Sequence, residues 1–194
     1  MNVRETGIDE GISEVIVTTR SASGTFNAAP IGIITTTNEH FVKLYKSSRT
    51  FINVQETKKL AANVTSDVVL FVKAAFDDLG ESHYSSLSGF PVLKEANSWI
   101  IFQAALAEKS TEYSLFQLTP LTIVINRKEL KAINRGLNAV IEATILATRY
   151  LRVNDEREKE ELKKQMERYA EIVEKCGGHR EKEAMGILEK KFFK

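Results

Sequence analysis

Two short segments of the chain combine residue types that could hold a small ligand. The first, Asn27–Gly32 (NAAPIG), has small side chains and a proline, which lacks a backbone N–H. Small side chains let a flat ligand approach the backbone, whose N–H and C=O groups can then bind the ligand's edge. An edge strand with a proline bulge has the same composition, so this segment alone leaves both interpretations open.

The second segment, Lys46–Thr50 (KSSRT), directly precedes a stretch with helical composition. It combines hydroxyl groups, the guanidinium of Arg49 and the N–H groups at the start of a helix. Together these groups could bind a phosphate without a glycine-rich loop. The alternative interpretation is a solvated, capped turn.

Short β-strands in the first part of the chain must position these segments. Apolar and β-branched runs predict strands at Ile12–Thr19, Ala29–Thr36, Phe41–Tyr45, Val68–Val72, Trp99–Ala104 and Leu121–Ile125. The composition of Thr50–Ala62 predicts a short helix or two helical turns. Many short strands with no long helix between them predict an antiparallel barrel or sandwich.

The pattern becomes helical after Asn126, which is followed three residues later by Glu129 in a variant of the capping box. Apolar residues between Leu130 and Thr148 then fall mostly on one helical stripe. Asn154 can cap a second, highly charged helix that Gly177 and Gly178 stop, and Glu181–Phe193 has the pattern of a last short helix.

Taken together, the two segments resemble the flavin-reductase-like FMN-binding split β-barrels. There, a small-residue N-A-P strand is followed by T-x-x-N-I-x-x-T-x-x-F-x-x-N-V. The matching positions here are Thr50, Asn53, Val54, Thr57, Leu60, Asn63 and Val64, with Val54 in place of Ile and Leu60 in place of Phe. Asn134–Leu137, Ile141–Ala143 and Ala147–Arg149 extend the resemblance to a small archaeal family of uncharacterised FMN-binding split-barrel proteins.

With the strand and helix patterns, the resemblance implies an α+β fold. An antiparallel split β-barrel domain would cover residues 1–126, and a helical C-terminal subdomain, packed on the barrel, would cover residues 127–194. The resemblance also implies a homodimer with the flavin near the interface, and it makes a nicotinamide nucleotide a possible electron donor.

The resemblance implies FMN as the cofactor and gives the residues of both segments roles. Backbone groups of Asn27–Ile31 would contact the isoalloxazine edge, and Ser48–Thr50 would hold the phosphate. Asn53 and Asn63 would support the loop or touch the ribityl chain, whereas Arg135 could reach the phosphate or pair with a carboxylate. The candidate cofactor-binding residues are Asn27, Ala28, Ala29, Pro30, Ile31, Ser48, Arg49, Thr50, Asn53, Asn63 and Arg135.

Composition excludes several other functions. The net charge of +1 gives no general attraction to nucleic acid or to an anionic membrane. Cys176 is the single cysteine, and with His179 it provides too few ligands for zinc. No apolar run approaches the ~20 residues that span a bilayer, and no secretory signal is visible, so we expect a cytoplasmic protein without a metal site.

No side-chain constellation for catalysis is visible in the sequence, so the catalytic residues stay unassigned. His83 could cover the flavin or donate a proton, or it could be an ordinary histidine of a surface loop. The leading hypothesis is an FMN-dependent oxidoreductase of the flavin reductase type, in which the flavin carries the chemistry. The alternatives are a non-enzymatic flavin carrier or sensor, and a β-barrel module whose C-terminal helices bind a protein partner.

Overall fold

The computed structural model describes residues 2–193, which fold as two compact units. A barrel unit contains the chain up to Ser66 together with Asp77–Glu129. A helical unit contains Asp67–Phe76 together with the chain from Leu130 onward. No helix within the described residues combines the length and apolar character needed to cross a membrane.

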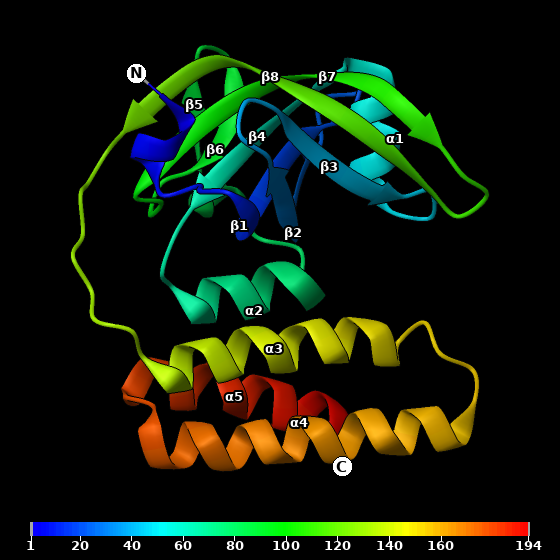
Figure 1. Cartoon of the computed structure of the whole chain (residues 1–194), viewed down its shortest axis with the longest axis vertical. Helices are drawn as coiled ribbons and strands as arrows, with labels where there is room; N and C mark the ends of the chain where they lie inside the picture. Colours follow the sequence, from blue (N-terminus) through cyan, green and yellow to red (C-terminus); the bar gives the residue numbers. More distant parts are fainter. Residues whose placement is uncertain (1, 194) are drawn as a thin grey trace. The chain divides into compact units, whose positions relative to one another are not determined.

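The barrel unit contains a closed antiparallel barrel with the strand order β1-β2-β3-β8-β7-β4 (Figure 1). The strands are β1 (Gly11–Arg20), β2 (Phe26–Thr35), β3 (His40–Tyr45), β4 (Lys59–Val64), β7 (Ser98–Lys109) and β8 (Tyr113–Ile125). The unit also holds the hairpin of β5 (Tyr84–Leu87) and β6 (Phe90–Leu93), the helix α1 (Arg49–Thr57), and the 3-10 turns η1 (Val3–Thr6) and η2 (Glu81–His83). The barrel and the helices that follow it confirm the predicted α+β split-barrel class.

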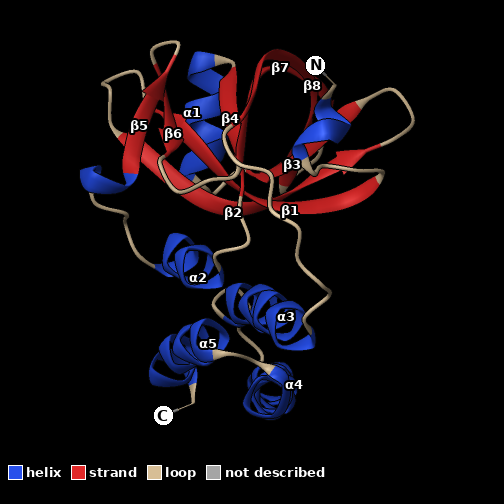
Figure 2. Ribbon diagram, turned by 90° about the vertical axis from the view of Figure 1, so that its left-hand side faces the viewer, coloured by secondary structure: helices blue, strands red, loops and turns tan. Residues whose placement is uncertain are grey.

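Alternating apolar side chains of the strands fill the barrel. Val15 and Val17 of β1, for example, are almost fully buried in the core, as strand geometry requires of residues two apart. Phe51 and Val54 of α1 belong to the same core, so α1 is anchored by its apolar face. Figure 2 shows α1 among the strands of the barrel unit. The start of α1 is thereby fixed relative to the strands.

The barrel is split along part of β2. β1 pairs with the whole of β2, from Gly11 opposite Thr35 to Arg20 opposite Phe26. β3 pairs only with the end of β2, at Ile33–Thr35. Within the described residues, Phe26–Gly32 therefore has a strand partner on its β1 side alone, which leaves backbone groups along its other edge available to a ligand.

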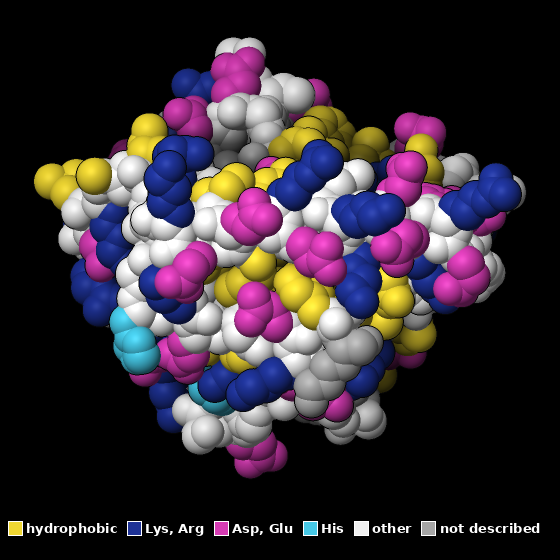
Figure 3. All heavy atoms as spheres, turned by 90° about the horizontal axis from the view of Figure 1, so that it is seen from below, with side chains coloured by type: hydrophobic (Ala, Val, Ile, Leu, Met, Phe, Trp, Pro, Cys, Tyr) yellow, Lys and Arg dark blue, Asp and Glu magenta, His cyan; other side chains and the backbone are white. Residues whose placement is uncertain are grey.

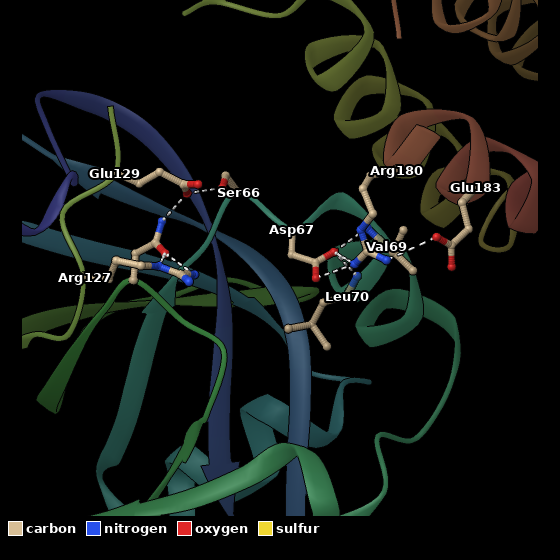
Figure 4. A network of polar contacts seen from close by, with 9 residues as sticks. Ser66, Asp67, Val69, Leu70, Arg127, Glu129, Arg180 and Glu183 are labelled. Carbon is tan, nitrogen blue, oxygen red and sulfur yellow. Dashed lines mark hydrogen bonds and ion pairs between the residues drawn. The ribbon is translucent and has the colours of Figure 1, made fainter. Parts of the chain in front are cut away.

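The helical unit contains α2 (Val68–Phe76), α3 (Arg135–Tyr150), α4 (Glu156–Cys176) and α5 (His179–Phe192). Val140, Met166 and Leu188 are fully buried in its core. Arg180 donates to both carboxylate oxygens of Asp67, each at 2.6 Å, which links α5 to the start of α2 (Figure 4). Lys and Arg side chains alternate with Asp and Glu on the face shown in Figure 3, as the mixed charge of α4 predicts.

The strand predicted at Val68–Val72 is wrong, because this segment is the first part of α2. Its apolar residues are buried, and a buried helix and a buried strand give the same continuous apolar run. The cap decides between them: the carboxylate of Asp67 accepts hydrogen bonds from the N–H groups of Val69 and Leu70, at 3.0 and 3.1 Å.

The helix predicted to begin at Asn126 begins instead at Arg135, with Asn134 as its cap. The Asn126 side chain donates to the carbonyl of Ala96, and the residue lies nine positions before the helix begins. The carboxylate of Glu129 accepts hydrogen bonds from Ser66 and Asn97 rather than closing a capping box (Figure 4).

Two smaller predictions also needed correction, and one pair of strands was missed. The helix predicted over Thr50–Ala62 ends at Thr57, because Lys58 adopts a left-handed conformation with φ 56° and the chain turns into β4. Asp155, not Asn154, caps α4. The short strands β5 and β6, on either side of a Ser88-Gly89 turn, were not predicted.

Candidate functional site

A hydrogen bond joins the two segments that the sequence singled out. The side-chain amide of Asn27, in β2, donates to the hydroxyl of Thr50, in the first turn of α1, at 3.1 Å. Thr50 is only 2% exposed, whereas Asn27 is half-buried. The split edge of β2 and the start of α1 therefore border the same site.

The β2 side of the site is a strip of small residues. Because strand side chains alternate, Ala28, Pro30 and Gly32 share one face, and Asn27 and Ile31 share the other. Ile31 packs against the barrel core, while the small residues are half-buried and leave the backbone approachable. A flat ring could lie against this strip and hydrogen-bond with the unpaired edge of β2.

The start of α1 offers several hydrogen-bond donors. Ser48 caps the helix: its hydroxyl accepts from the N–H of Phe51 at 3.1 Å and donates to the carbonyl of Tyr45 at 2.7 Å. The N–H groups of Arg49 and Thr50 have no partner inside the helix, because the first turn lacks preceding carbonyls. The first turn contains no acidic residue, so the positive end of the helix dipole is not neutralised from within the helix.

The guanidinium of Arg49 lies at the surface beside this helix start. It forms an ion pair with Asp78 at 2.6 Å, and the two side chains are 68% and 76% exposed. An exposed ion pair of this kind contributes only about 0–1 kcal/mol to stability. A ligand anion that binds the guanidinium more tightly can therefore replace the carboxylate of Asp78.

Asn53 and Asn63 are buried and hold elements of the barrel unit together. Asn53 donates to the hydroxyl of Thr19 at 2.9 Å, linking α1 to β1. Asn63 donates to the carbonyl of Ile16 at 2.8 Å and accepts from the N–H of Leu93 at 2.7 Å, linking β4 to β1 and β6. This geometry suits support of the site better than direct contact with a ligand.

Arg135 lies in the helical unit, as the exposed first residue of α3. It is therefore in a different unit from the other ten candidate residues. Cys176 ends α4 and His179 begins α5. No group of three or more His, Cys, Asp or Glu side chains within residues 2–193 is arranged to hold a metal ion.

The sequence did not indicate that Phe26, Asp78 and Tyr84 lie together near the site. The rings of Phe26 and Tyr84 lie 5.2 Å apart, and Phe26 directly precedes Asn27. Burial, with the charge of Asp78 as a smaller cause, raises the pKa of Tyr84 to about 12. The one available signal was the position of Phe26 beside the small-residue strip, because nothing in the sequence relates Tyr84 or Asp78 to it.

Two sequence models of one protein family match the chain. The N-terminal domain model, described as a protein of unknown function (DUF447), covers residues 13–127, and the C-terminal model covers residues 134–190. The chain is also 26% identical over 190 residues to the uncharacterized protein MJ1453 of Methanocaldococcus jannaschii, covering 91% of this chain and 96% of that protein.

Solved structures show the same fold. The FMN-bound protein MM1853 of Methanosarcina mazei, described as DUF447, is 40% identical and superposes with a TM-score of 0.88 over 97% of this chain and 99% of its own. The flavin reductase PheA2 is 20% identical, with a TM-score of 0.52 over 66% of this chain and 90% of its own. The second likeness concerns the fold alone and confirms the resemblance to flavin-reductase-like split barrels.

Proposed function

Because the chain belongs to the DUF447 family, we propose that it binds FMN at the junction of β2 and α1. The M. mazei relative described as FMN-bound shares 40% of its residues and nearly its whole length with this chain. The observation that carries the proposal is the hydrogen bond between Asn27 and Thr50, which brings the unpaired edge of β2 and an anion-binding helix start to one site.

The start of α1 fits the phosphate. A phosphate monoester carries about −1.5 to −2 charges at pH 7 and needs strong donors. The guanidinium of Arg49 and the open N–H groups of Arg49 and Thr50 provide them at the positive end of a helix, and the Ser48 hydroxyl would join them by turning away from the Tyr45 carbonyl. Hydrogen bonds to a charged group contribute about 1.5–3 kcal/mol each, more than the exposed pair with Asp78.

The strip Ala28–Pro30–Gly32 fits the isoalloxazine ring. Larger side chains at these positions would hold a planar ring away from the backbone, whereas the small ones let it approach the free edge of β2. Backbone groups of Asn27–Ile31 would then orient the ring edge. Asn53 would hold α1 against β1, and Asn63 would hold β4 against β1, so that both elements support the site.

Bound FMN would supply redox chemistry, and the chain's residues would bind and orient it and shape its surroundings. We propose an oxidoreductase of the flavin reductase type, working as a homodimer in the cytoplasm with a nicotinamide nucleotide as electron donor. A flavin carrier or sensor would use the same site without turnover. Arg135 as a phosphate ligand, and the packing of the C-terminal helices on the barrel, remain predictions.

A titration tests the binding proposal. Flavin-free protein should quench the fluorescence of added FMN with a one-to-one stoichiometry per chain, because ring and phosphate are both held. Full fluorescence at saturating protein would contradict the proposal. The holoprotein should then oxidise NADH or NADPH in the presence of an electron acceptor; binding of FMN without such turnover would identify a carrier or sensor instead.

A further inference from the structure

We propose that a pocket on the barrel unit, apart from the proposed flavin site, binds a small organic anion whose charged head is attached to an apolar body. This hairpin pocket, with a volume of about 270 Å3, lies beside the turn between β5 and β6. Six of the residues that line it carry the argument: Arg20, Lys59, Ser88, Phe90, Ile101 and Leu121. It is independent of the proposed flavin site.

The pocket carries uncompensated positive charge. Arg20 and Lys59 are its charged lining residues, and no aspartate or glutamate lines it. Among residues 2–193, neither cation forms an ion pair; Arg20 donates only to the carbonyl of Gly89, at 3.3 Å. Two unpaired cations at a concave surface attract an anion and offer it charge-assisted hydrogen bonds.

The backbone fixes the rim that holds Arg20. Ser88 and Gly89 have φ angles of 49° and 76°, as the two central residues of a tight hairpin turn of the I′ type require. A left-handed serine is uncommon, because its Cβ is strained there. The turn presents the Gly89 carbonyl to Arg20, which holds the guanidinium at the rim of the pocket.

The opposite side of the pocket is apolar. Phe90 and Ile101 form a buried floor, whereas Leu121 is 52% exposed. The pairing of β7 with β8 passes from Ile101–Thr122 to Phe102–Pro120, which leaves Leu121 as an extra residue in a β-bulge. A β-bulge redirects side chains. Here it places the apolar side chain of Leu121 in the lining of a pocket that Arg20 and Lys59 also line.

This combination selects the chemistry of the ligand. The cations would bind a carboxylate or a phosphate, and the apolar floor would bind a single ring or a branched aliphatic group. The volume is slightly below the range of about 300–1,000 Å3 for drug-sized ligands, so a one-ring molecule is the appropriate size.

The hairpin pocket is separate from the proposed FMN phosphate site. Thr57, at the end of α1, lines the pocket, whereas Ser48 caps the start of α1. A helical rise of 1.5 Å per residue separates these positions by roughly 13 Å.

The test uses the full-length protein saturated with FMN and four probes. Benzoate and phenyl phosphate carry an anionic head on a ring, benzamide lacks the charge, and inorganic phosphate lacks the ring. Calorimetry gives the dissociation constants, and amide chemical shifts locate the binding. We expect benzoate or phenyl phosphate to shift the Gly89 and Leu121 amides and to bind more tightly than both controls; the tighter of the two identifies the preferred head group.

Three variants locate the site, and a fourth is the control. Arg20→Gln and Lys59→Gln should each weaken binding of the preferred anion about tenfold or more. Leu121→Glu should abolish binding, because it adds a carboxylate at an exposed position that does not affect the core. Lys109→Gln, an exposed cation at the end of β7, should change nothing. Equal binding of benzamide, no binding of either anion, or an equal effect of Lys109→Gln would overturn the proposal, whatever the protein's affinity for FMN.

Discussion

Arg49 and Asp78 form an ion pair at 2.6 Å next to the first turn of α1, with both side chains largely exposed. The guanidinium is the one charged side chain among the proposed phosphate ligands of the barrel unit. The carboxylate of Asp78 therefore binds the same guanidinium that a phosphate would bind. Binding of FMN has to replace this contact or share the guanidinium with it.

Asp78→Asn should strengthen FMN binding, because it removes the carboxylate that competes for Arg49. An exposed ion pair contributes about 0.2–1 kcal/mol, so we expect a gain of up to about fivefold in a fluorescence titration. Glu81→Gln, which removes a charge from the same segment, is the matched control and should leave the affinity unchanged. A weaker affinity in Asp78→Asn would show that Asp78 assists the flavin.

Arg49→Ala should weaken the binding of FMN much more than that of riboflavin. Riboflavin has the same ring and ribityl chain but no phosphate, so it cannot use the guanidinium. Loss of a charge-assisted contact of about 1.5–3 kcal/mol predicts a loss of about 10- to 100-fold for FMN in parallel titrations. Equal weakening of both ligands would refute the assignment of the phosphate to α1.

The barrel should lose stability as the pH falls below about 6.5. Burial, and to a smaller extent the charge of Arg4, lowers the pKa of His40 below its ordinary value of 6.5. The unfolded chain therefore binds a proton more readily than the folded chain, and protonation favours unfolding. The stabilising effect is present above pH 6.5, and it is lost as the pH falls from there through the lowered pKa.

His40→Gln isolates this effect, because glutamine does not titrate and its side chain can still hydrogen-bond near Thr35. Urea unfolding at pH 7.5 and pH 5.5 should show a smaller loss of stability in the variant than in the wild type. An identical loss in both proteins would attribute the acid sensitivity to other groups.

Gly136→Ala should destabilise the helical unit. A Cβ at Gly136 would lie 2.5 Å from the Cα of Gly177, so the start of α3 and the end of α4 could not approach as closely as they do. Overpacking of this kind costs about 1–3 kcal/mol, to be measured by thermal or urea unfolding.

Gly186→Ala is the matched control, because Gly186 lies inside α5 with open space around the added methyl group. It should stabilise the protein by about 0.4–1 kcal/mol. Destabilisation by both substitutions would mean that helix packing at Gly136 is not the cause.

Strands of the barrel were predictable where they contain short apolar runs, because such a run is a local property. β1, β2, β3 and β7 lie at predicted runs, whereas only the last part of β8 was predicted and β4 fell mostly within the helix predicted over Thr50–Ala62. α2 was mistaken for a strand because Val68–Val72 is an unbroken apolar run of buried residues, which shows no helical period. The cap at Asp67 was the available local signal for a helix there.

The candidate site was predictable in part, since Ser48 and Asn27 belong to segments whose local chemistry is visible. The contacts between distant parts of the chain were not predictable. Nothing local pairs Arg49 with Asp78, or Phe26 with Tyr84, because these residues meet only through the fold. The buried hydrogen bonds of Asn63 likewise have their partners in β1 and β6, so the sequence around Asn63 does not predict them.

The absorbance spectrum of the full-length protein as purified, with mass identification of any released cofactor, tests the central claim most directly. The account predicts a yellow protein with flavin absorption bands that releases FMN on denaturation. A colourless protein that takes up no FMN when the flavin is added, or a released cofactor other than FMN, would contradict it.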